Sequence, residues 1–372
     1  MQILKNSNFR ALSKIAGMKP EEVIELVKKS GLSGRGGANF PTGLKLEFTR
    51  SSQGEKYVIA NADEGEPGTF KDKLILEKNP NNVIEGMIIA GYAIGSSKGY
   101  LYLRGEYSYL KNKLQKVINN AKKIADKLKI YFDIEIISGA GAYICGDETA
   151  IIESVEGKRG NPRLKPPFPA NQGLFNKPTL INNVETLANL PLIILDKSWN
   201  NSFRLFSLSG NITKPGVYEL ESGASLKKLI NLGKPKNKIK AVYFGCSEGC
   251  LPYEDIALNN EAVKEKGAML GSCAIIAVDE KHNIVDVATN IAKFFEYESC
   301  GKCTPCREGT MRVLELLEKI SLKKAANEDL ELLEELCRVI NETSLCGLGQ
   351  SSTAHITTAL KYFRKEFTDK LK

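Results

Sequence analysis

Apolar side chains recur at helical spacing between residues 110 and 128. Leucine, isoleucine, valine and alanine stand three or four positions apart, with lysine and asparagine between them. This period predicts an amphipathic helix with one buried face. Residues 20–30 predict a second helix, because Pro20 begins the segment, acidic residues follow it, and Gly31 comes directly after the segment. A buried helix is expected over residues 82–94.

Strands are expected between these helices. Apolar runs predict strands over residues 57–60, 99–103 and 132–137. Strands that alternate with helices predict an open α/β sheet. In such sheets ligands bind beyond the carboxyl ends of the strands. We therefore expect residues 1–198 to form an α/β domain with a ligand site at its strand ends.

The pattern changes after about residue 198. Short strands are expected around one small helix at residues 225–231, which predicts a compact α+β domain over residues 199–282. These strands cover residues 205–209, 216–219, 241–244 and 274–278. The remainder, residues 283–372, predicts a small helical domain interrupted by cysteine-containing loops.

Composition narrows the classes of function. The chain has 372 residues, nine cysteines, two histidines and a formal charge of +8. No apolar run approaches the ~20 residues that span a bilayer. The basic N-terminus is followed by no apolar segment, so no signal peptide is expected and the cysteines belong to a reducing compartment. With so few histidines, chemistry that needs a histidine proton shuttle is not expected. The charge suits phosphate-bearing ligands, acidic partners or nucleic acid equally.

A cysteine-rich loop carries the most specific signal. Cys300, Cys303 and Cys306 are each separated by two residues within the segment 298–309. Three thiolates in one loop can bind three corners of an iron–sulfur cubane, which needs four ligands. A structural zinc site is the alternative, but zinc ligands usually come as two short pairs. The spacing therefore favours an iron–sulfur cluster.

Two cysteines further along could supply the fourth ligand. Cys337 falls on the apolar face of a predicted helix, which is typical of a core position. Cys346 lies beside Gly347 and Gly349, which free the backbone to present a side chain outward. We expect Cys346 to be the ligand.

Two glycine-rich segments suit a phosphate-bearing cofactor. Five glycines occur within residues 31–43, close to Arg35 and Lys45. Amide groups and cations in such a loop can bind a phosphate, although a flexible connector has a similar composition. The aromatic residues Phe40 and Phe48 favour a cofactor ring over a connector.

A second loop, residues 139–149, also lies between a strand and a helix, as in nucleotide-binding turns. Between the two loops, Asp63, Glu64 and Glu66 follow a predicted strand. They are either a solvated turn or acceptors for ribose hydroxyls and a ring edge. Together with a cluster, these loops suit a hydride donor, a flavin and a one-electron carrier.

Five segments of the chain, in order, resemble the NADH-binding flavoprotein subunit of respiratory complex I and the diaphorase subunits of soluble hydrogenases and formate dehydrogenases. The resemblance covers nearly the whole chain. The segments are Gly34–Gly43, Asn61–Gly68, Gly139–Gly146, Arg163–Ala170 and Glu298–Gly309.

The resemblance implies a fold and an activity. The fold would be α/β, with a Rossmann-like domain for FMN and NADH, a ubiquitin-like β-grasp domain of the soluble-ligand-binding type, and a C-terminal helical bundle with a [4Fe–4S] cluster. The activity would be that of an NADH dehydrogenase, with hydride passing between NAD(H) and FMN and single electrons passing to the cluster. The sequence does not separate a complex I-type complex from a soluble hydrogenase or formate dehydrogenase, whether bifurcating or not.

The resemblance also implies site residues. The expected FMN contacts are Gly34, Arg35, Gly36, Gly37, Lys45, Asn61, Asp63, Glu64, Tyr143, Gly146, Glu148, Asn182 and Asn183. The expected NADH contacts are Phe40, Phe48, Glu66 and Phe168. The cluster ligands would be Cys300, Cys303, Cys306 and Cys346. Bound FMN would carry out hydride transfer, so no side chain is expected to be catalytic.

The implied partners are a thioredoxin-like [2Fe–2S] subunit and further iron–sulfur subunits of a larger complex. A cytoplasmic location follows, peripheral to the membrane through that complex, without membrane insertion or nucleic-acid binding. The net charge and the cysteines also suggest an alternative, a zinc-bearing nucleic-acid-binding protein. However, the residues on either side of the cysteine loop are acidic or of mixed charge, whereas such a protein would have clustered basic residues there.

Two positions depart from the family pattern. Asn39 stands where glycine is usual, and asparagine is among the non-glycine residues that best tolerate positive φ. Asp147 stands where glutamate is usual, which leaves its role open. Cys246, Cys250 and Cys273 belong to no motif and are expected to be buried thiols.

Overall fold

The computed structural model describes residues 1–139 and 141–372, so Ala140 of the second glycine loop lies outside the described residues. The described chain divides into two compact units. The first contains Met1–Gly65 and Phe70–Arg204, and the second contains Glu66–Thr69 and Leu205–Lys372. The short segment 66–69 therefore belongs with the C-terminal half of the chain.

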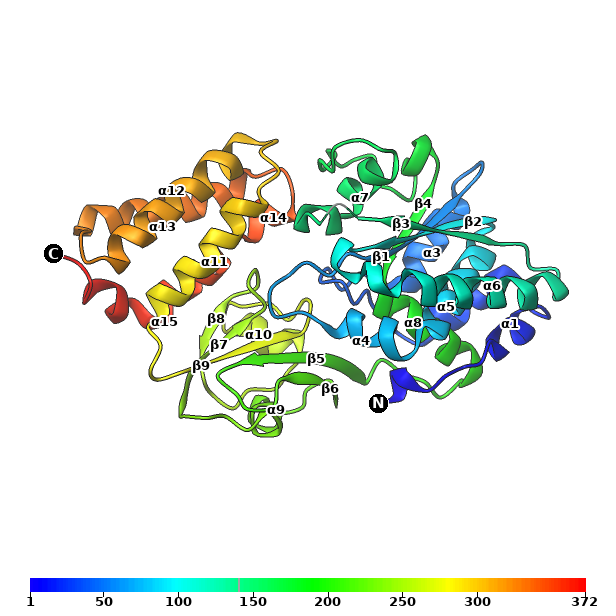
Figure 1. The fold of residues 1–372 in the computed structure, drawn as a ribbon, viewed down its shortest axis with the longest axis horizontal. Helices are drawn as coiled ribbons and strands as arrows, with labels where there is room; N and C mark the ends of the chain where they lie inside the picture. Colours follow the sequence, from blue (N-terminus) through cyan, green and yellow to red (C-terminus); the bar gives the residue numbers. More distant parts are fainter. Residues whose placement is uncertain (140) are drawn as a thin grey trace. The chain divides into compact units, whose positions relative to one another are not determined.

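The first unit contains a four-stranded parallel sheet (Figure 1). Its strands are β1 (Tyr57–Ala62), β2 (Lys98–Leu103), β3 (Asp133–Ser138) and β4 (Thr179–Asn183), in the order β3-β2-β1-β4. The three predicted strands are confirmed, and β4 is an addition. The chain adds β2 and β3 on one side of β1 and then places β4 on the other. The order of the sheet therefore reverses between β1 and β4.

Helices complete the first unit. Their bounds are α1 (Arg10–Ile15), α2 (Pro20–Lys29), α3 (Thr42–Ser51), α4 (Lys71–Lys78), α5 (Pro80–Ile94), α6 (Lys111–Lys127), α7 (Glu148–Val155) and α8 (Val184–Leu195). Short 3-10 turns lie at Gln2–Leu4, Gly105–Leu110, Tyr143–Gly146 and Leu174–Asn176.

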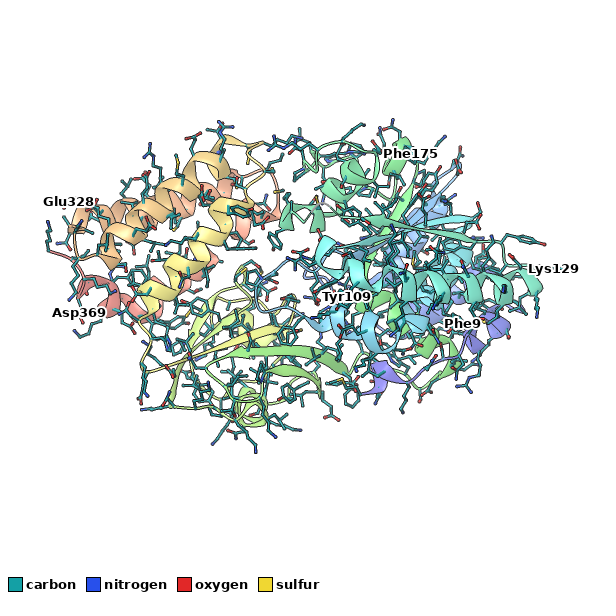
Figure 2. All side chains as sticks on the ribbon, viewed as in Figure 1. Phe9, Tyr109, Lys129, Phe175, Glu328 and Asp369 are labelled. Atoms are coloured by element: carbon teal, nitrogen blue, oxygen red, sulfur yellow. The ribbon has the colours of Figure 1, made fainter. Side chains whose placement is uncertain are left out.

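The predicted helices over residues 20–30, 82–94 and 110–128 are confirmed as α2, α5 and α6. Helix α5 is buried along almost its whole length, where it packs on α8 and on β1. Helix α6 buries one face only, as its period predicted. In the segment between α7 and β4, Phe175, labelled in Figure 2, packs edge-on against Tyr57 with ring centroids 5.8 Å apart.

The second unit begins with a five-stranded mixed sheet in the order β6-β5-β9-β7-β8. Its elements are β5 (Phe203–Gly210), β6 (Gly216–Glu221), α9 (Leu226–Gly233), β7 (Ile239–Phe244), β8 (Cys250–Pro252), α10 (Asn260–Glu265) and β9 (Ala274–Asp279). Strand β9 pairs in parallel with β5 and antiparallel with β7. The predicted strands and helix are confirmed, while β8 and α10 were not predicted.

The chain ends in helices, drawn from yellow to red in Figure 1. These are α11 (Ile284–Glu298), α12 (Thr304–Ser321), α13 (Asn327–Thr343), α14 (Gly347–Ser351) and α15 (Ala354–Thr368). Helix α12 packs on α11 and α13, and their apolar faces share one core. The cysteine loop joins α11 to α12, and Cys346 directly precedes α14. Among the described residues, no helix is long and apolar enough to cross a membrane.

Candidate functional site

The reversal of strand order places two predicted polar segments side by side. Strand β1 leads into Asn61, Asp63 and Glu64, while β4 ends at Asn182 and Asn183. The parallel register pairs Asn61 with Asn183. Ligands of open α/β sheets bind at such a switch point, beyond the carboxyl ends of the strands. The fold therefore brings together the asparagines and carboxylates that lie in two distant parts of the sequence.

The first glycine loop lies against the same strand end. The amide of Arg35 donates to the hydroxyl of Thr186 (2.9 Å), in the first turn of α8. A Cβ built at Gly36 would lie 3.3 Å from the Cβ of Asn183, so the loop approaches β4 closely. At Gly37, where φ is +120°, a Cβ would meet no atom within 4 Å. The loop thus approaches β4 closely at Gly36 and leaves open space beside Gly37.

The backbone conformation of one residue and the side-chain contacts of another distinguish this loop from a simple phosphate site. Asn39 adopts φ of +53°, which confirms that asparagine accepts the left-handed conformation here. The side chain of Arg35 is buried, and its guanidinium donates to the side chain of Asn201 (2.6 Å) and the carbonyl of Phe203 (3.0 Å). Arg35 therefore offers the loop its backbone, while its charge faces the protein interior.

Glu64 is also turned inward. Its carboxylate accepts hydrogen bonds from the amides of Asp72 (2.8 Å) and Lys73 (3.0 Å) at the start of α4, and from the hydroxyl of Tyr107 (3.2 Å). Burial and the nearby Asp72 raise the pKa of Glu64 to about 7, while Lys71 and the two amides oppose this rise. The structure thus shows Glu64 as the cap of α4 beside the strand end.

The second glycine loop is tied to β1. The side-chain amide of Asn61 donates to the carbonyl of Gly146 (2.9 Å), and Tyr143 packs on Gly65, where a Cβ would lie 3.1 Å from its ring. Asp147 accepts from the amides of Thr149 (2.8 Å) and Ala150 (3.1 Å), so it is the N-cap of α7. This gives the unassigned Asp147 a structural role.

Lys45 and Glu148, both expected at the FMN site, form an ion pair of 3.2 Å. Glu148 also pairs with Lys165 at 2.8 Å. Burial alone would raise the pKa of Glu148, but the two lysines hold it below its usual range. The pair therefore stays ionised at neutral pH.

These residues fit a flavin nucleotide. The side-chain nitrogen of Asn182 is buried and has no hydrogen-bond partner within the described part of the chain, although a buried amide normally has one. The open space at Gly37 lies one residue from the contact between Gly36 and Asn183. A ligand with ring acceptors and a phosphate would satisfy the amide and fill the space at the loop.

Three of the four residues expected to bind NADH are exposed aromatics. Phe40, Phe48 and Phe168 are 45–56% exposed, whereas large aromatic side chains are usually more buried. The rings of Phe40 and Phe48 lie 6.4 Å apart at 44°. Exposed rings held close together in this way can stack on a planar ligand.

Glu66 lies in the segment that belongs to the second unit. Its Oε1 accepts from the hydroxyl of Ser247 (2.8 Å) and lies 3.3 Å from the amide nitrogen of Cys246. Its Oε2 accepts from the hydroxyl of Thr69 (3.3 Å). Glu66 thus anchors its own segment to the turn after β7. Nothing in the sequence pattern indicated Ser247 as its partner.

The cysteines expected as cluster ligands lie in one part of the helical region. Burial raises the pKa of Cys306 to about 11, and the nearby thiols of Cys303, Cys346 and Cys300 add to this rise. Ser299 contacts the sulfur of Cys306 at 3.3 Å. The thiols of Cys300, Cys303 and Cys346 therefore lie within electrostatic range of Cys306.

The geometry of this group differs from that of a single-ion site. No group of three or more His, Cys, Asp or Glu side chains within residues 1–139 and 141–372 is placed to hold one metal ion. A cubane binds each cysteine sulfur at a different iron, so its ligands need not meet at one point. Four neighbouring thiols fit that donor set.

The other cysteines lie in the core. Cys337 is buried on the apolar face of α13 with Leu330, Leu333 and Ile340, as predicted. Cys246, Cys250 and Cys273 are buried thiols, which confirms that prediction.

The chain is similar to known proteins. Residues 27–192 match the family described as "Nuo51 FMN-binding domain". Residues 286–370 match the family described as "NADH-ubiquinone oxidoreductase-F iron-sulfur binding region". The F 2 subunit of NADH-quinone oxidoreductase of Rhizobium meliloti is 44% identical over 96% of this chain and 91% of its own length. The HndC subunit of NADP-reducing hydrogenase of Solidesulfovibrio fructosivorans is 41% identical over 96% of this chain and 78% of its own.

A solved structure is also similar. A chain of the NAD⁺-reducing [NiFe]-hydrogenase in its H2-reduced state matches 98% of this chain with a TM-score of 0.92 and 35% identity. The present chain spans 64% of that hydrogenase chain.

The fold and the two sites define an iron–sulfur flavoprotein. Its cofactors are FMN and a [4Fe–4S] cluster, and NAD(H) is its substrate. The chain belongs to the family of the F subunits of NADH-quinone oxidoreductase, whose members are oxidoreductase flavoproteins. The comparisons include both complex I-type and hydrogenase-type relatives, and they give no support to a zinc-bearing nucleic-acid-binding protein.

Proposed function

We propose that FMN binds at the switch point between β1 and β4 and exchanges hydride with NAD(H) there. The observation that carries this assignment is the meeting of three segments at one strand end. They are the glycine loop at residues 34–37, the segment Asn61–Glu64 and the pair Asn182 and Asn183. Bound FMN supplies the hydride and one-electron chemistry, so the chain needs no histidine base.

Different residues would bind the phosphate end and the ring of FMN. The Gly34–Gly37 backbone and Lys45 would hold the phosphate end, with Glu148 keeping Lys45 in place. Asn61, Asp63, Asn182 and Asn183 would hold the ring, with Tyr143 and Gly146 beside them. Glu64 would support this group from α4, through the amides it caps.

Phe40, Phe48 and Phe168 would stack on NAD(H), and Glu66 would accept from its ribose hydroxyls. The exposure of the three rings supports the first assignment, because their faces are free to meet a planar ligand. The anchoring of Glu66 by Ser247 supports the second, because a carboxylate held in one position binds with less loss of entropy.

The thiols of Cys300, Cys303, Cys306 and Cys346 would bind the [4Fe–4S] cluster. Their proximity around Cys306 and their position at the ends of α11, α12 and α14 support this ligand set. Because the fold leaves Cys337 on the buried face of α13, Cys346 is the better fourth ligand.

We divide the chain into an FMN- and NADH-binding domain (residues 1–198), a β-grasp domain (199–282) and a helical cluster domain (283–372). The strand order β6-β5-β9-β7-β8 supports the middle assignment, since it places the first and last strands of the module in parallel at the centre. Helix α9, between the second and third strands, has the position expected in that fold.

The chain would work within a larger complex, next to a thioredoxin-like [2Fe–2S] subunit and further iron–sulfur subunits. Its location would be cytoplasmic, peripheral to a membrane when the complex is membrane-bound. Relatives that are subunits of NADH-quinone oxidoreductase and of a hydrogenase support this assignment.

Anaerobic purification tests the proposed function. The protein should contain FMN, iron and sulfide, and its flavin absorption should bleach when NADH is added. Asn182→Leu, which keeps the side-chain size but removes the amide, should bind FMN at least about ten-fold more weakly. A colourless protein, or an Asn182→Leu variant with wild-type FMN affinity, would contradict the assignment.

A further inference from the structure

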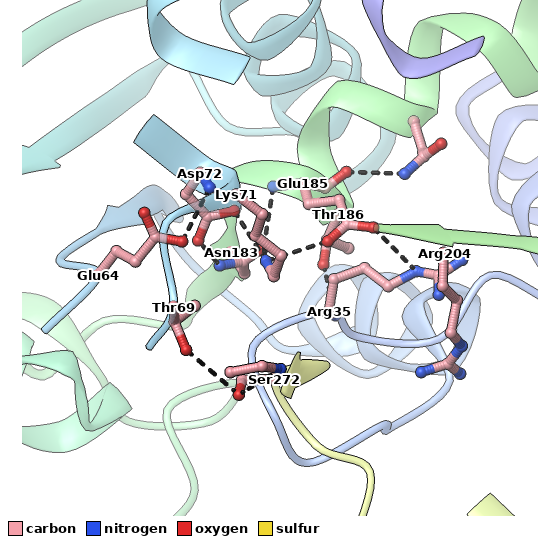
Figure 3. Close-up of polar contacts among 12 residues, drawn as sticks. Arg35, Glu64, Thr69, Lys71, Asp72, Asn183, Glu185, Thr186, Arg204 and Ser272 are labelled. Carbon is pink, nitrogen blue, oxygen red and sulfur yellow. Dashed lines mark hydrogen bonds and ion pairs between the residues drawn. The ribbon is translucent and has the colours of Figure 1, made fainter. Parts of the chain in front are cut away.

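A network of buried charges lies between the segments that form the candidate FMN site (Figure 3). Lys71, at the start of α4, is only 2% exposed. Its ammonium lies 2.8 Å from Asp72 Oδ1 and 3.0 Å from Glu185 Oε2. The opposite oxygen of Glu185 lies 3.9 Å from the guanidinium of Arg35. Buried lysines are rare unless they are paired, so these contacts are what permits the burial of Lys71 at the start of α4.

The network fixes the amide of Asn183. The side-chain nitrogen of Asn183 donates to Asp72 Oδ2, while its oxygen accepts from the amide of Glu185 (2.8 Å) and lies 3.5 Å from the ammonium of Lys71. An ionised carboxylate can only accept, and an ammonium can only donate. Asp72 and Lys71 therefore allow one of the two orientations that the Asn183 amide could adopt.

The ammonium of Lys71 stays charged despite its burial, whereas burial raises the pKa of Asp72 and the nearby Lys71 opposes that rise. Burial alone would lower the pKa of Lys71, but Asp72, Glu185 and Glu64 raise it above its ordinary value. Lys71 is therefore charged at neutral pH. Removal of the cation alone would take the ammonium away from Asp72 and Glu185 while both stay buried, which is strongly destabilising.

The same network reaches the glycine loop. Arg35, which meets Glu185, lies in that loop, and its amide donates to Thr186 in the first turn of α8. Gly36 packs against Asn183. The cation of Lys71 is thus linked, through two side chains, to both the loop and the strand end that would face the cofactor.

We propose that Lys71 and Asp72 are positioning residues of the flavin site, which fix the orientation of the Asn183 amide and the place of the glycine loop against β4. Neither residue touches the cofactor in this account. The inference rests on the proposed position of FMN, and it adds two residues that no motif of the glycine loops contains.

Three variants test this inference. Lys71→Met removes the cation and keeps the side-chain length. The double variant Lys71→Met with Asp72→Asn also removes the carboxylate charge, so that less uncompensated charge is buried. Lys78→Met, at the exposed end of the same helix, is the matched control. For each protein we would measure the melting temperature, the dissociation constant of FMN, and the visible circular dichroism of the bound flavin.

A positioning role and a structural role predict different results for the double variant. We expect Lys71→Met to lower both the melting temperature and the affinity for FMN. The double variant should regain melting temperature relative to Lys71→Met, while its FMN dissociation constant stays at least about ten-fold above that of the wild type and its flavin dichroism stays altered. Lys78→Met should match the wild type in every measurement.

Wild-type FMN affinity in the double variant, or an equal loss in Lys78→Met, would overturn the inference. If Lys71→Met does not fold, Asp72→Asn alone gives the same test, because it keeps the side-chain volume and removes the obligate acceptor. A wild-type protein that binds no FMN would instead overturn the proposed flavin site, so the two failures are distinguishable.

Discussion

The carboxylate of Glu66 lies 2.8 Å from the hydroxyl of Ser247, 181 residues further along the chain. The segment Glu66–Thr69 belongs to the second unit of the fold, while the residues on both sides of it belong to the first. Glu66 therefore has an anchoring role in addition to the NADH contact proposed for it.

Glu66→Gln separates these two roles. Glutamine keeps one oxygen to accept from Ser247, so the anchor can survive, but it removes the negative charge. We expect the KM for NADH to rise about ten-fold, as for a lost charge-assisted hydrogen bond, with FMN content unchanged. Steady-state kinetics with ferricyanide measure this, and Glu254→Gln, an exposed residue of the same unit, is the control. An unchanged KM would leave Glu66 with the anchoring role alone.

Asp147→Ala tests the N-cap of α7. The variant loses the acceptor for the amides of Thr149 and Ala150, which typically costs ~1 kcal/mol. For a unit of this size we expect the melting temperature to fall by about 2–4 °C. Asp147→Asn, which can still cap, should stay close to the wild type. If Asp147→Ala instead loses FMN at an unchanged melting temperature, Asp147 acts on the cofactor and its cap is secondary.

His355 should make the fold sensitive to acid. It is fully buried in α15 and stacks on Phe295, and burial lowers its pKa to about 3. In the unfolded chain a histidine binds its proton below about pH 6.5, whereas the folded protein excludes that proton until about pH 3. The stability from neutral His355 is therefore complete above pH 6.5 and is lost progressively as the pH falls to 3.

The difference in unfolding free energy between the wild type and His355→Leu isolates this effect. We expect the difference to shrink by a few kcal/mol as the pH is lowered from about 7 to about 4, because leucine binds no proton in either state. Denaturant unfolding at several pH values measures it. A difference that does not vary with pH would mean that His355 is protonated in the folded protein.

The elements that the sequence predicted are those whose pattern is local. The period of α6 and the apolar runs of β1, β2 and β3 follow from burial of one face or of a whole strand. The positive φ of Asn39 followed from the steric tolerance of asparagine. The glycine loops and the cysteine spacing likewise indicated candidate sites, because each of these motifs consists of residues that are close together in the sequence.

Helix α4 could not be predicted in the same way. Its first residues, Lys71 and Asp72, normally indicate a solvated segment, yet both are buried here. What permits their burial is Glu185 and Asn183, which lie far away in the sequence, and no local pattern reveals such pairing. The contact of Glu66 with Ser247 was missed for the same reason. Sequence reasoning named candidate site residues, and only the fold showed which side chains pack around them.

Electrons from NADH should reach a cluster held by Cys346 after they pass through the flavin. Single-turnover reduction of Cys346→Ser and Cys337→Ser tests it most directly, with flavin absorption and the electron paramagnetic resonance of the reduced cluster followed anaerobically. We predict that NADH bleaches the flavin in both variants and that only Cys337→Ser shows the signal of a reduced [4Fe–4S] cluster. A cluster signal that survives in Cys346→Ser and disappears in Cys337→Ser would contradict the account.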